Sequence, residues 1–425
     1  MQHRVLIGAY ACLVNPEVEV PGGGDLMAWN LVERLGRVHH LGVLTAAQNR
    51  KAIEAALRKA PLPNVQFVYV ALPGWLDPLL RHQGALQFYA YLWQWRAYFT
   101  ASRLNRRIPF DLFHHLTYEN DWMASIIGAL LPVPYLRGPA GGAHRVPKAF
   151  RKQFPAGSHF WEYVRIALQW VFRHDPFFML GHSRAKVLLM ANSEALDALP
   201  ARWRKRAQLL SVNGVSVQSP NRTAISESSN GHFRLLTAGR FVPLKGFDLA
   251  VRAFSVMVQS LKQQGRRNQA QLNIVGEGPE RSRLQGLITQ LHLEDQVHLV
   301  SWMTRDELLR EMAKCDVFLF PSLRDGGGLV VVEAMSAGKP VVCLDLGGPG
   351  LHVTEACGVK VAAYSPEQAI KDLAGALERL YADPKLRQQM GQAARRRAEE
   401  LYDWDRVADR VMEAYDKALE GEISI

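Results

Sequence analysis

The sequence predicts an α/β protein with two Rossmann-like domains, each built on a parallel β-sheet and facing a central cleft. Short apolar segments rich in Val, Ile and Leu alternate with amphipathic segments along the chain, which is the pattern of parallel strands covered by helices. A length of 425 residues suits two or three domains at about 150 residues each. A cleft between two such domains is a common place for a ligand.

The expected elements follow this alternation in order. In the first half, apolar runs predict strands at 4–9, 40–45, 65–71, 111–114, 133–137 and 187–192, with helices at 25–35 and 51–59. The second half repeats the pattern, with strands at 233–239, 270–275, 297–300, 317–321 and 340–344. Helices are expected between them at 247–262, 281–291, 305–313, 328–337 and 366–381.

A change of composition marks the domain boundary. Asn213-Gly214 is a turn signal, and residues 217–232 are rich in Ser and Asn without apolar periodicity. We therefore expect a first domain at 1–213, a linker at 214–232 and a second domain at 233–404. A C-terminal helix at about 405–425 is expected to pack back on the first domain.

Charge is unevenly distributed between the two halves. The chain has 51 Lys plus Arg and 40 Asp plus Glu. Residues 1–213 contain 25 basic and 13 acidic residues, a net of +12, and residues 214–425 contain 26 and 27, a net of −1. Such an asymmetry favours an anionic partner for the first half, either a membrane surface, a phosphorylated substrate or nucleic acid. A solvated basic face is the ordinary alternative.

Several classes of protein are disfavoured by what the sequence lacks. It has no run of about 18 apolar residues that would span a membrane, and its first residues do not form a secretory signal. The four cysteines have no metal-type spacing, and no zinc-finger, RNA-binding or helix-turn-helix pattern supports a nucleic-acid partner. We expect a reduced, cytoplasmic protein without a metal site.

Three segments of the second half contain residues suited to chemistry. TAGRFVPLKGF at 237–247 passes from a strand into a helix, which places Arg240 and Lys245 at the carboxyl edge of the sheet. Two cations there suit a diphosphate, although an ordinary basic loop would look the same. LNIVGEGPE at 272–280 ends a strand at Gly276, and glycines allow the backbone to approach a ligand closely. Alone, this second segment is a weak signal.

The third segment is the most informative. PSLRDGGGLVVVEAMSAGKPVV at 321–342 has a glycine-rich loop before a helix that starts near Gly328, and the N–H groups of such a helix start can bind an anion. Asp325 lies in the loop. Glu333 lies among apolar helix residues, so it is either solvent-facing or a buried carboxylate that binds a ligand.

Together these motifs resemble the retaining GT-B glycosyltransferases of glycosyltransferase family 4, the glycosyl transferases group 1. The shared pattern is GR-x4-KG, VGxGP and an acidic-Gly-x-Gly-Leu-x3-Glu-Ala-Met stretch followed by Gly-x-Pro-Val. The resemblance covers nearly all of the second domain. It extends more loosely into the first through PGGG at 21–24, FDLFHH at 110–115 and SVNGV at 211–215.

The resemblance implies a role for each matching residue. Arg240 and Lys245 match the pair that holds the donor diphosphate, Asp325 the acid that contacts the donor sugar, and Glu333 the carboxylate that accepts the ribose hydroxyls. The remaining matches line the donor: Gly326, Gly327, Gly328 and Leu329 beside sugar and phosphate, Gly23 and Gly24 from the first domain, and Trp302 and Met303 at the nucleobase. Gly276 belongs to the same substrate-binding set.

The sequence departs from the family pattern at three positions. Asp325 stands where the family typically has Glu, and Gly327 stands where an aromatic residue is usual. The first-domain motif is commonly Asp-x-x-His-x-His; here Leu116 takes the place of the second histidine. His114 and His115 therefore both stay candidate catalytic residues, although a histidine in a strand is more often packed in the core.

Two aromatic and basic segments of the first half suggest where an acceptor binds. Residues 81–107 contain seven aromatic residues followed by Arg103, Arg106 and Arg107, and residues 144–174 are similar in character. Such segments suit peripheral contact with an anionic membrane or a groove in which sugars stack. Packing of the same aromatics in the core is the ordinary alternative.

The resemblance implies a retaining hexosyltransferase. The expected reaction moves a hexose from a UDP- or GDP-sugar to a hydroxyl of a glycan or lipid-linked acceptor, in the synthesis of cell-surface polysaccharide or glycolipid. No Asp-x-Asp metal motif is apparent, so no cofactor and no obligatory metal ion is expected. The alternatives are a phosphorylase-like GT-B enzyme with a pyridoxal cofactor and a non-catalytic sugar-nucleotide-binding protein.

Overall fold

The computed structural model divides the chain into two compact units. It describes residues 2–12, 23–81, 83–117, 121–142, 145–152, 154, 156–211, 213–216, 233–265 and 270–420. The first unit comprises Met1–Ala143, Phe160–Val212 and Trp404–Ile425, and the second comprises His144–His159 and Asn213–Asp403. Residues 217–232 of the expected linker lie outside the described residues.

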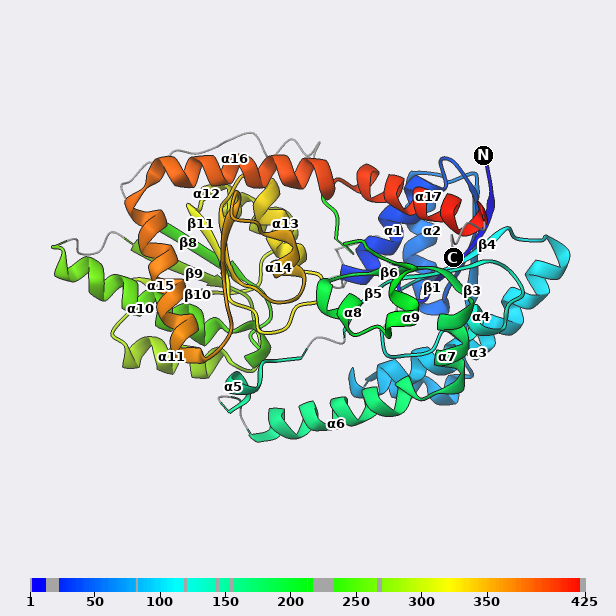
Figure 1. Cartoon of the computed structure of the whole chain (residues 1–425), viewed down its shortest axis with the longest axis horizontal. Helices are drawn as coiled ribbons and strands as arrows, with labels where there is room; N and C mark the ends of the chain where they lie inside the picture. The colour runs from blue at the N-terminus through cyan, green and yellow to red at the C-terminus, as the bar shows by residue number, and fades with distance from the viewer. Residues whose placement is uncertain are drawn as a thin grey trace. The chain divides into compact units, whose positions relative to one another are not determined.

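The first unit is built on a seven-stranded parallel sheet with the strand order β3-β2-β1-β4-β5-β6-β7. Figure 1 shows helices around this sheet. Its strands are β1 (Arg4–Ala9), β2 (His40–Ala46), β3 (Val65–Val70), β4 (Leu112–Thr117), β5 (Tyr135–Ala140), β6 (Ala185–Met190) and β7 (Ala207–Leu209). Its helices are α1 (Gly23–Leu35), α2 (Arg50–Lys59), α3 (Gln83–Arg107), α4 (Ile126–Leu130), α6 (Ala156–Arg173), α7 (Pro176–Arg184), α8 (Ser193–Asp197), α9 (Ala201–Arg204) and α17 (Trp404–Glu420). Short 3-10 turns η1 (Ala47–Asn49) and η2 (Gly74–Arg81) complete it.

Two apolar layers hold the helices of the first unit to its sheet. One layer joins α1 and α17 to the strands and includes Leu31, Val411 and Tyr415. The other joins α3, α4 and α7 and includes Trp93 and Phe178. The C-terminal helix α17 therefore belongs to the core of the first unit, where it packs beside α1 and the strands β4, β5 and β6.

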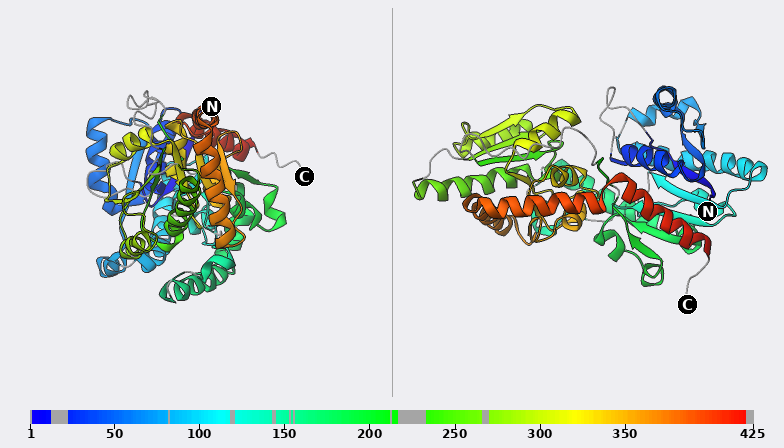
Figure 2. Two further views of the ribbon diagram at one scale, coloured as in Figure 1. Left: turned by 90° about the vertical axis from the view of Figure 1, so that its left-hand side faces the viewer. Right: turned by 90° about the horizontal axis from the view of Figure 1, so that it is seen from above.

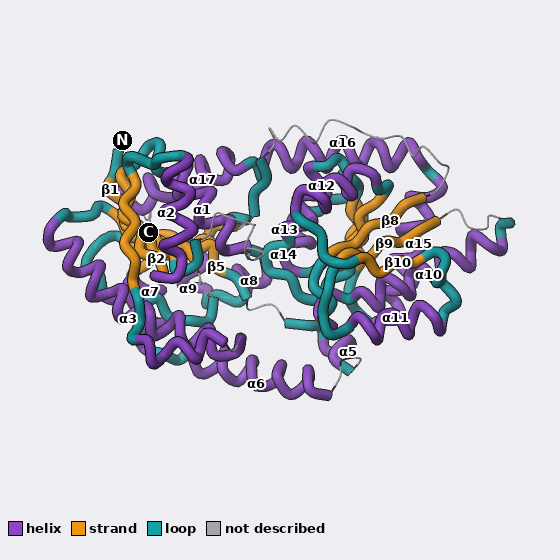
Figure 3. The backbone as a smooth tube through the Cα atoms, turned by 180° about the vertical axis from the view of Figure 1, so that it is seen from behind, coloured by secondary structure: helices purple, strands orange, loops and turns teal. Residues whose placement is uncertain are grey.

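The second unit is built on a six-stranded parallel sheet with the strand order β10-β9-β8-β11-β12-β13. Its strands are β8 (Phe233–Ala238), β9 (Ala270–Val275), β10 (Val297–Val300), β11 (Val317–Phe320), β12 (Val341–Leu344) and β13 (Gly358–Val361). Its helices are α5 (Lys148–Arg151), η4 (Pro243–Lys245), α10 (Phe247–Gln263), α11 (Arg281–Gln290), α12 (Arg305–Lys314), α13 (Leu329–Ser336), α14 (Gly347–His352), α15 (Pro366–Ala382) and α16 (Pro384–Leu401). Figures 2 and 3 show these elements from other directions.

Helices cover both faces of this second sheet as well. On one face, α10, α11 and α15 pack around Phe254, Leu272 and Leu377. On the other, α12, α13 and α16 pack around Phe318 and Met335. Val146 and Phe150 also lie in the core of this unit, so these two residues pack with a domain whose first strand begins at Phe233.

The two sheets share one topology, and it confirms the predicted fold class. Counted from the first strand of each unit, the second sheet follows the order 3-2-1-4-5-6, and the first follows the same order with a seventh strand added after strand 6. In both, the chain reverses its direction of progress between strands 1 and 4. In such doubly wound sheets, ligands bind outside the carboxyl ends of the strands at this reversal. In the second unit, that position lies beyond β8 and β11.

Candidate functional site

The candidate site begins where β8 and β11 end. These strands are paired side by side, Val317 with Leu235 and Phe318 with Leu236, so the loops that follow them, 239–246 and 321–328, leave the same edge of the sheet. The segments TAGRFVPLKGF and PSLRDGGGL, about 80 residues apart in the sequence, thus meet at the reversal of strand order.

An ion pair joins the two loops. The Lys245 Nζ lies 2.5 Å from Oδ2 of Asp325, and the same ammonium lies 5.1 Å from the centre of the Phe320 ring. Both charged side chains are largely but not fully covered, with 19% and 18% of their surfaces exposed. A partly buried ion pair of this kind is stronger than one on the surface.

The second oxygen of Asp325 binds the glycine-rich loop just before α13. Oδ1 accepts hydrogen bonds from the Gly328 N–H at 2.7 Å and the Gly327 N–H at 3.2 Å. The short side chain of Asp can reach N–H groups two and three residues ahead. The Asp at this position, where the family usually has Glu, therefore has a local structural effect: it holds the glycine-rich loop against the start of α13.

The surroundings of Asp325 keep it ionised. Burial on its own raises the pKa of this carboxyl, but the Lys245 ammonium and the N–H groups of Gly328 and Gly327 outweigh burial and lower its pKa below the ordinary value. Lys245, the start of α13 and one carboxylate thus form a compact arrangement in which donors for an anion are already oriented.

Gly328 occupies a backbone conformation that favours glycine. It is the N-cap of α13 with φ 69° and ψ 40°, in the left-handed region. The neighbouring Gly326, Gly327 and Leu329 are half-buried, whereas Gly328 itself is buried. A Cβ at Gly328 would lie 2.9 Å from the Pro349 ring, so a residue with a side chain would also crowd α14.

Arg240 and Lys245 differ in their surroundings. The Arg240 side chain is exposed, and within the described part of the chain it has no ion pair, whereas Lys245 is held by Asp325. Arg240 is therefore free to meet an anion from solvent.

Glu333 is a buried carboxylate with a basic partner. It is 4% exposed, and its Oε1 accepts a hydrogen bond from Nε of Arg305 at 2.7 Å. Arg305 is the first residue of α12, whose start is fixed by a capping box between Thr304 and Glu307. The structure excludes the solvent-facing alternative for Glu333, and ligand binding by this residue stays a prediction.

The residues expected at the nucleobase precede this helix. Trp302 is 46% exposed, and Met303 is half-buried against the apolar layer around Phe318. Both lie in the loop between β10 and α12, close in sequence to Arg305.

Gly276 makes a close backbone contact within the protein. A Cβ at this position would lie 1.9 Å from the carbonyl oxygen of Gly239, and the Gly239 N–H donates to the Val275 carbonyl at 3.0 Å. The close approach that the glycine permits is therefore to the loop carrying Arg240, so Gly276 sets the path of that loop.

The two candidate histidines of the first unit lie inside its core. His114 is fully buried in β4, with Nδ1 2.8 Å from the Tyr415 hydroxyl and Nε2 2.6 Å from the Gly138 carbonyl oxygen. His115 is 2% exposed, and its Nδ1 lies 2.6 Å from Oγ of Ser125. These contacts are those of packed histidines that join strands and helices of one domain.

The other first-unit residues stand at the start of a helix. Gly23 and Gly24 are the first residues of α1, and a Cβ at Gly24 would meet no atom within 4 Å. The loop before them, 13–22, lies outside the described residues.

Sequence reasoning missed two residues that contact the site. Arg305 was not distinguished from other surface arginines, because nothing in the sequence relates it to Glu333, 28 residues later. His352 at the end of α14 is fully buried, and its Nε2 lies 2.5 Å from the carbonyl oxygen of Gly327. Its place in GGPGLH after a predicted strand was the available signal.

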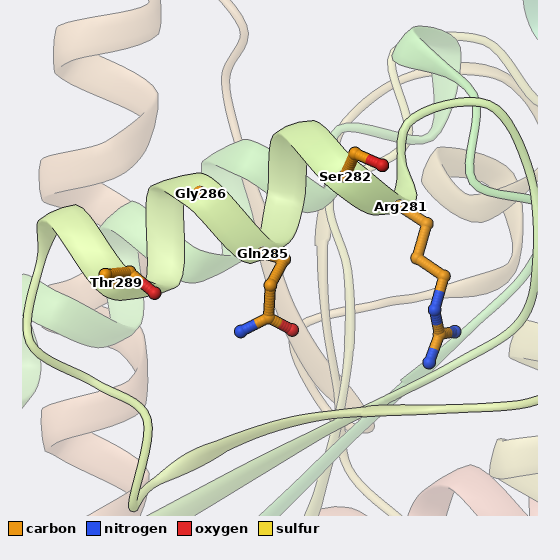
Figure 4. Close-up of a pocket in the computed structure, with 5 residues that line it drawn as sticks. All are labelled: Arg281, Ser282, Gln285, Gly286 and Thr289. Carbon is orange, nitrogen blue, oxygen red and sulfur yellow. The ribbon is translucent and has the colours of Figure 1, made fainter.

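Outside this site, the described residues include a depression along α11 but no metal-binding cluster. They contain no group of three His, Cys, Asp or Glu side chains that could hold a metal ion. An open depression of about 510 Å³ lies along α11, where it is lined by Arg281, Ser282, Gln285, Gly286 and Thr289 (Figure 4). All five belong to one helix and only Arg281 is charged, so we assign it no chemistry.

Comparison with known sequences agrees with the geometry of the second unit. Residues 219–397 match the family model described as Glycosyl transferases group 1. The D-inositol 3-phosphate glycosyltransferase of Kineococcus radiotolerans is 33% identical over 201 residues, which are 44% of this chain and 44% of that protein. The MMP alpha-(1->4)-mannosyltransferase of Mycolicibacterium hassiacum is 27% identical over 180 residues, 42% of this chain and 43% of that protein. The chain thus spans less than half the length of these relatives.

Comparison with solved structures extends over both units. The Anabaena protein HepE in complex with UDP and glucose is 18% identical with a TM-score of 0.61, covering 98% of this chain and 100% of that one. Sucrose-phosphate synthase from Thermosynechococcus elongatus is 19% identical with a TM-score of 0.65, covering 99% and 100%. At these identities the likeness is one of fold. It supports the GT-B architecture, and the family match is confined to residues 219–397.

Proposed function

We propose that the protein is a retaining glycosyltransferase that moves a hexose from a nucleoside diphosphate sugar to a hydroxyl of a glycan or lipid-linked acceptor. The observation that carries this proposal is the arrangement at the end of β8 and β11: Lys245, Asp325 and the start of α13 lie together at the reversal of strand order, where such sheets bind ligands.

Each part of the site has a role in this proposal. Arg240 and Lys245 bind the donor diphosphate, Glu333 accepts the ribose hydroxyls while Arg305 holds it in place, and Asp325 contacts the sugar. The backbone of Gly326, Gly327, Gly328 and Leu329 lines sugar and phosphate, Trp302 and Met303 face the base, and Gly23 and Gly24 approach the diphosphate. We assign His114, His115 and Gly276 to positioning, because their contacts are with the protein itself.

The chemical step follows from where charge develops. The bond between the anomeric carbon and the phosphate oxygen breaks, and its electron pair leaves with the nucleoside diphosphate. The acceptor oxygen forms the new bond on the same face, and its proton passes to the leaving phosphate. The negative charge grows beside Arg240, Lys245 and the first N–H groups of α13, and these donors stabilise it; Lys245 is already held in place by Asp325. No metal ion takes part in this proposal.

A panel of donors tests the proposal. A ligand that binds only the native state raises thermal stability, so UDP-, GDP- and ADP-sugars are compared by the shift of the unfolding temperature. Transfer and donor hydrolysis are then measured with the donor that shifts it. A donor that binds without either reaction would favour the non-catalytic binder, and phosphorolysis with a pyridoxal absorbance would favour the phosphorylase-like enzyme.

We further propose that the first unit contacts an anionic membrane surface on the cytoplasmic face. The helices α3, α6 and α7 contain a single carboxylate, Glu162, which is buried and paired with Arg165. No helix in the described ranges is long and apolar enough to cross a membrane. Contact of this kind would therefore be peripheral.

The exposed side chains of α3 and α6 support this second proposal. On α3, Tyr89 and Trp93 face the core, whereas Phe88 and Phe99 are 51% and 56% exposed and share the exposed face with arginines near the end of the helix. On α6, large apolar side chains at helical spacing are exposed: Tyr163, Trp170 and Val171. Exposed aromatics beside cations, without exposed carboxylates on these helices, suit a lipid interface.

A further inference from the structure

A buried histidine outside the glycine-rich loop of the second unit anchors this loop together with Asp325. His352 ends α14 and has no exposed surface. Its Nε2 lies 2.5 Å from the Gly327 carbonyl oxygen, and its Nδ1 lies 3.0 Å from the Tyr402 hydroxyl. The two ring nitrogens therefore connect the loop before α13 to the residue that follows α16.

The contacts settle which nitrogen carries the proton. A carbonyl oxygen can only accept, so Nε2 must donate to Gly327. In the neutral ring Nδ1 then has a lone pair and accepts from the Tyr402 hydroxyl. Burial lowers the pKa of His352 to about 4, although the Gly327 contact and Asp325 raise it and Arg397 lowers it further. The imidazole is therefore neutral at physiological pH.

Tyr402 is itself held on several sides. It is 4% exposed, and its ring meets the His352 ring edge-on at 4.8 Å between centroids. Its carbonyl accepts from the Val215 N–H at 2.7 Å. Arg397, one turn earlier on α16, donates from Nε to the His352 carbonyl at 2.8 Å. The backbone and the ring of His352 are thus both fixed from the C-terminal end of α16.

Gly327 depends on these contacts because it has no side chain of its own. Its N–H donates to Asp325, and its carbonyl accepts from His352. The Gly348 N–H also donates to the Asp325 carbonyl at 2.9 Å. In this way α14 holds the loop at two carbonyls, while Asp325 holds it from within at two N–H groups.

We propose that His352 is a positioning residue, which Tyr402 keeps in one tautomer and orientation, and which fixes the Gly327 carbonyl so that the glycine-rich loop presents its backbone to the donor. The proposal rests on the proposed function, because the loop acts as a donor site only if a nucleoside diphosphate sugar binds there. In this proposal, His352 and Tyr402 affect donor affinity without contacting the donor, because they hold the loop that contacts it.

Hydrogen exchange of the ligand-free protein tests the positioning itself. His352→Ala and Tyr402→Phe are compared with wild type for amide exchange in peptides covering 321–336. Loss of one buried neutral hydrogen bond should accelerate exchange there by about 3- to 10-fold, while peptides of α10 and α15 stay unchanged. His352→Gln, which keeps an amide N–H near the place of Nε2, should restore part of the protection. His298→Gln and Tyr364→Phe, both at exposed positions, are the matched controls.

Nucleotide binding tests the consequence for the site. UDP, GDP and ADP are titrated into each variant, and affinity for the nucleotide that binds wild type should fall by a similar factor in His352→Ala and Tyr402→Phe. Unchanged exchange at 321–336 in both variants would overturn the proposal, as would faster exchange without any loss of affinity. If wild type binds none of the three, the proposed function fails, whereas the exchange result still decides whether His352 fixes the loop.

Discussion

The Lys245 ammonium and the Asp325 carboxylate, 80 residues apart in the sequence, form a contact of 2.5 Å between Nζ and Oδ2. The same carboxylate accepts two N–H groups at the start of α13, so cation and helix start are aligned before any ligand arrives. An anion entering this place meets oriented donors, and little reorganisation is then needed when charge develops. The anion must also share the Lys245 ammonium with the Asp325 carboxylate, which is already bound to it.

Replacement of the lysine tests this alignment. Lys245→Ala removes one charge-assisted contact to the donor diphosphate, worth roughly 1.5–3 kcal/mol, so transfer should slow by about 10- to 150-fold. The loss should fall on the transfer rate because charge appears on departure. Lys262→Ala, an exposed lysine at the end of α10, controls for loss of a charge. Normal turnover of Lys245→Ala at saturating donor would remove Lys245 from the mechanism.

Asp325→Asn separates the charge of this side chain from its hydrogen bonds. The amide oxygen can still accept from Gly328, while the ion pair with Lys245 is lost and the cation is released for phosphate. We expect nucleoside diphosphate affinity to be retained and sugar transfer to fall, with both followed by calorimetric titration and initial rates. A variant that loses nucleotide binding would show that Asp325 serves mainly to shape the loop.

Glu333→Gln should have the opposite effect. Its proposed target is the ribose, so affinity for the bare nucleoside diphosphate should fall by about 10-fold, in the range of a hydrogen bond to a charged group. Arg305 is 37% exposed and can turn to water, so the fold should tolerate the change. Asp306→Asn, at an exposed neighbouring position, is the control. Equal affinity in wild type and Glu333→Gln would contradict the ribose assignment.

Stability should decline in acid partly because of His352. In the unfolded chain this imidazole takes up a proton near its ordinary value of 6.5, whereas in the folded state its pKa is about 4. Its contribution is therefore fully present above pH 6.5 and is lost as the pH falls to 4, a change on the order of 3 kcal/mol.

Urea unfolding at pH 7 and pH 4.5 measures this contribution. The pKa of His182 in the first unit is also lowered, first by burial and then by Arg137, so the wild-type loss has more than one source. The difference in this loss of unfolding free energy between wild type and His352→Gln gives the contribution of His352. Equal acid sensitivity of the two proteins would mean that His352 does not resist protonation in the folded state.

Fold class and strand positions could be predicted from the sequence because parallel strands are buried on both faces. Segments 270–275 and 297–300 coincide with β9 and β10, since their apolar residues alternate with polar ones such as Asn273 and His298. The four-residue β13 was missed because it contains Lys360 at an exposed position. Likewise, nothing in the sequence around Val146 and Phe150 distinguishes packing with the second unit from packing with the first.

The residues of the candidate site could be predicted from sequence motifs, but the residues that contact them could not. Lys245, Asp325 and Glu333 lie in patterns that can be read locally, whereas their partners depend on which loops the sheet brings together. Arg305 meets Glu333 because α12 and α13 are neighbours, and His352 meets Gly327 because α14 packs beside α13. The burial of His114 depends on Tyr415, 301 residues later, which no local pattern reveals.

Vesicle binding tests the proposed membrane surface of the first unit. Each basic residue near an anionic surface adds on the order of 1 kcal/mol, so Arg103/Arg106/Arg107→Glu should weaken binding to anionic vesicles by on the order of 100-fold or more. These arginines lie at exposed positions at the end of α3. Arg252/Arg310/Arg396→Glu makes the same change in charge at exposed positions of the second unit and should leave binding largely intact.

Added salt and substitution of an exposed apolar side chain test the two contributions to vesicle binding separately. Exposed charges more than about 8–10 Å apart are screened at physiological ionic strength, so co-sedimentation with anionic vesicles should decrease as salt is added. Trp170→Ser should weaken binding at every salt concentration, because its 65% exposed ring contributes apolar contact that salt does not screen. Neutral vesicles should bind weakly in all cases. If neither vesicle type binds while transfer to a water-soluble acceptor is intact, the basic surface serves an anionic acceptor in solution, and the membrane proposal is wrong.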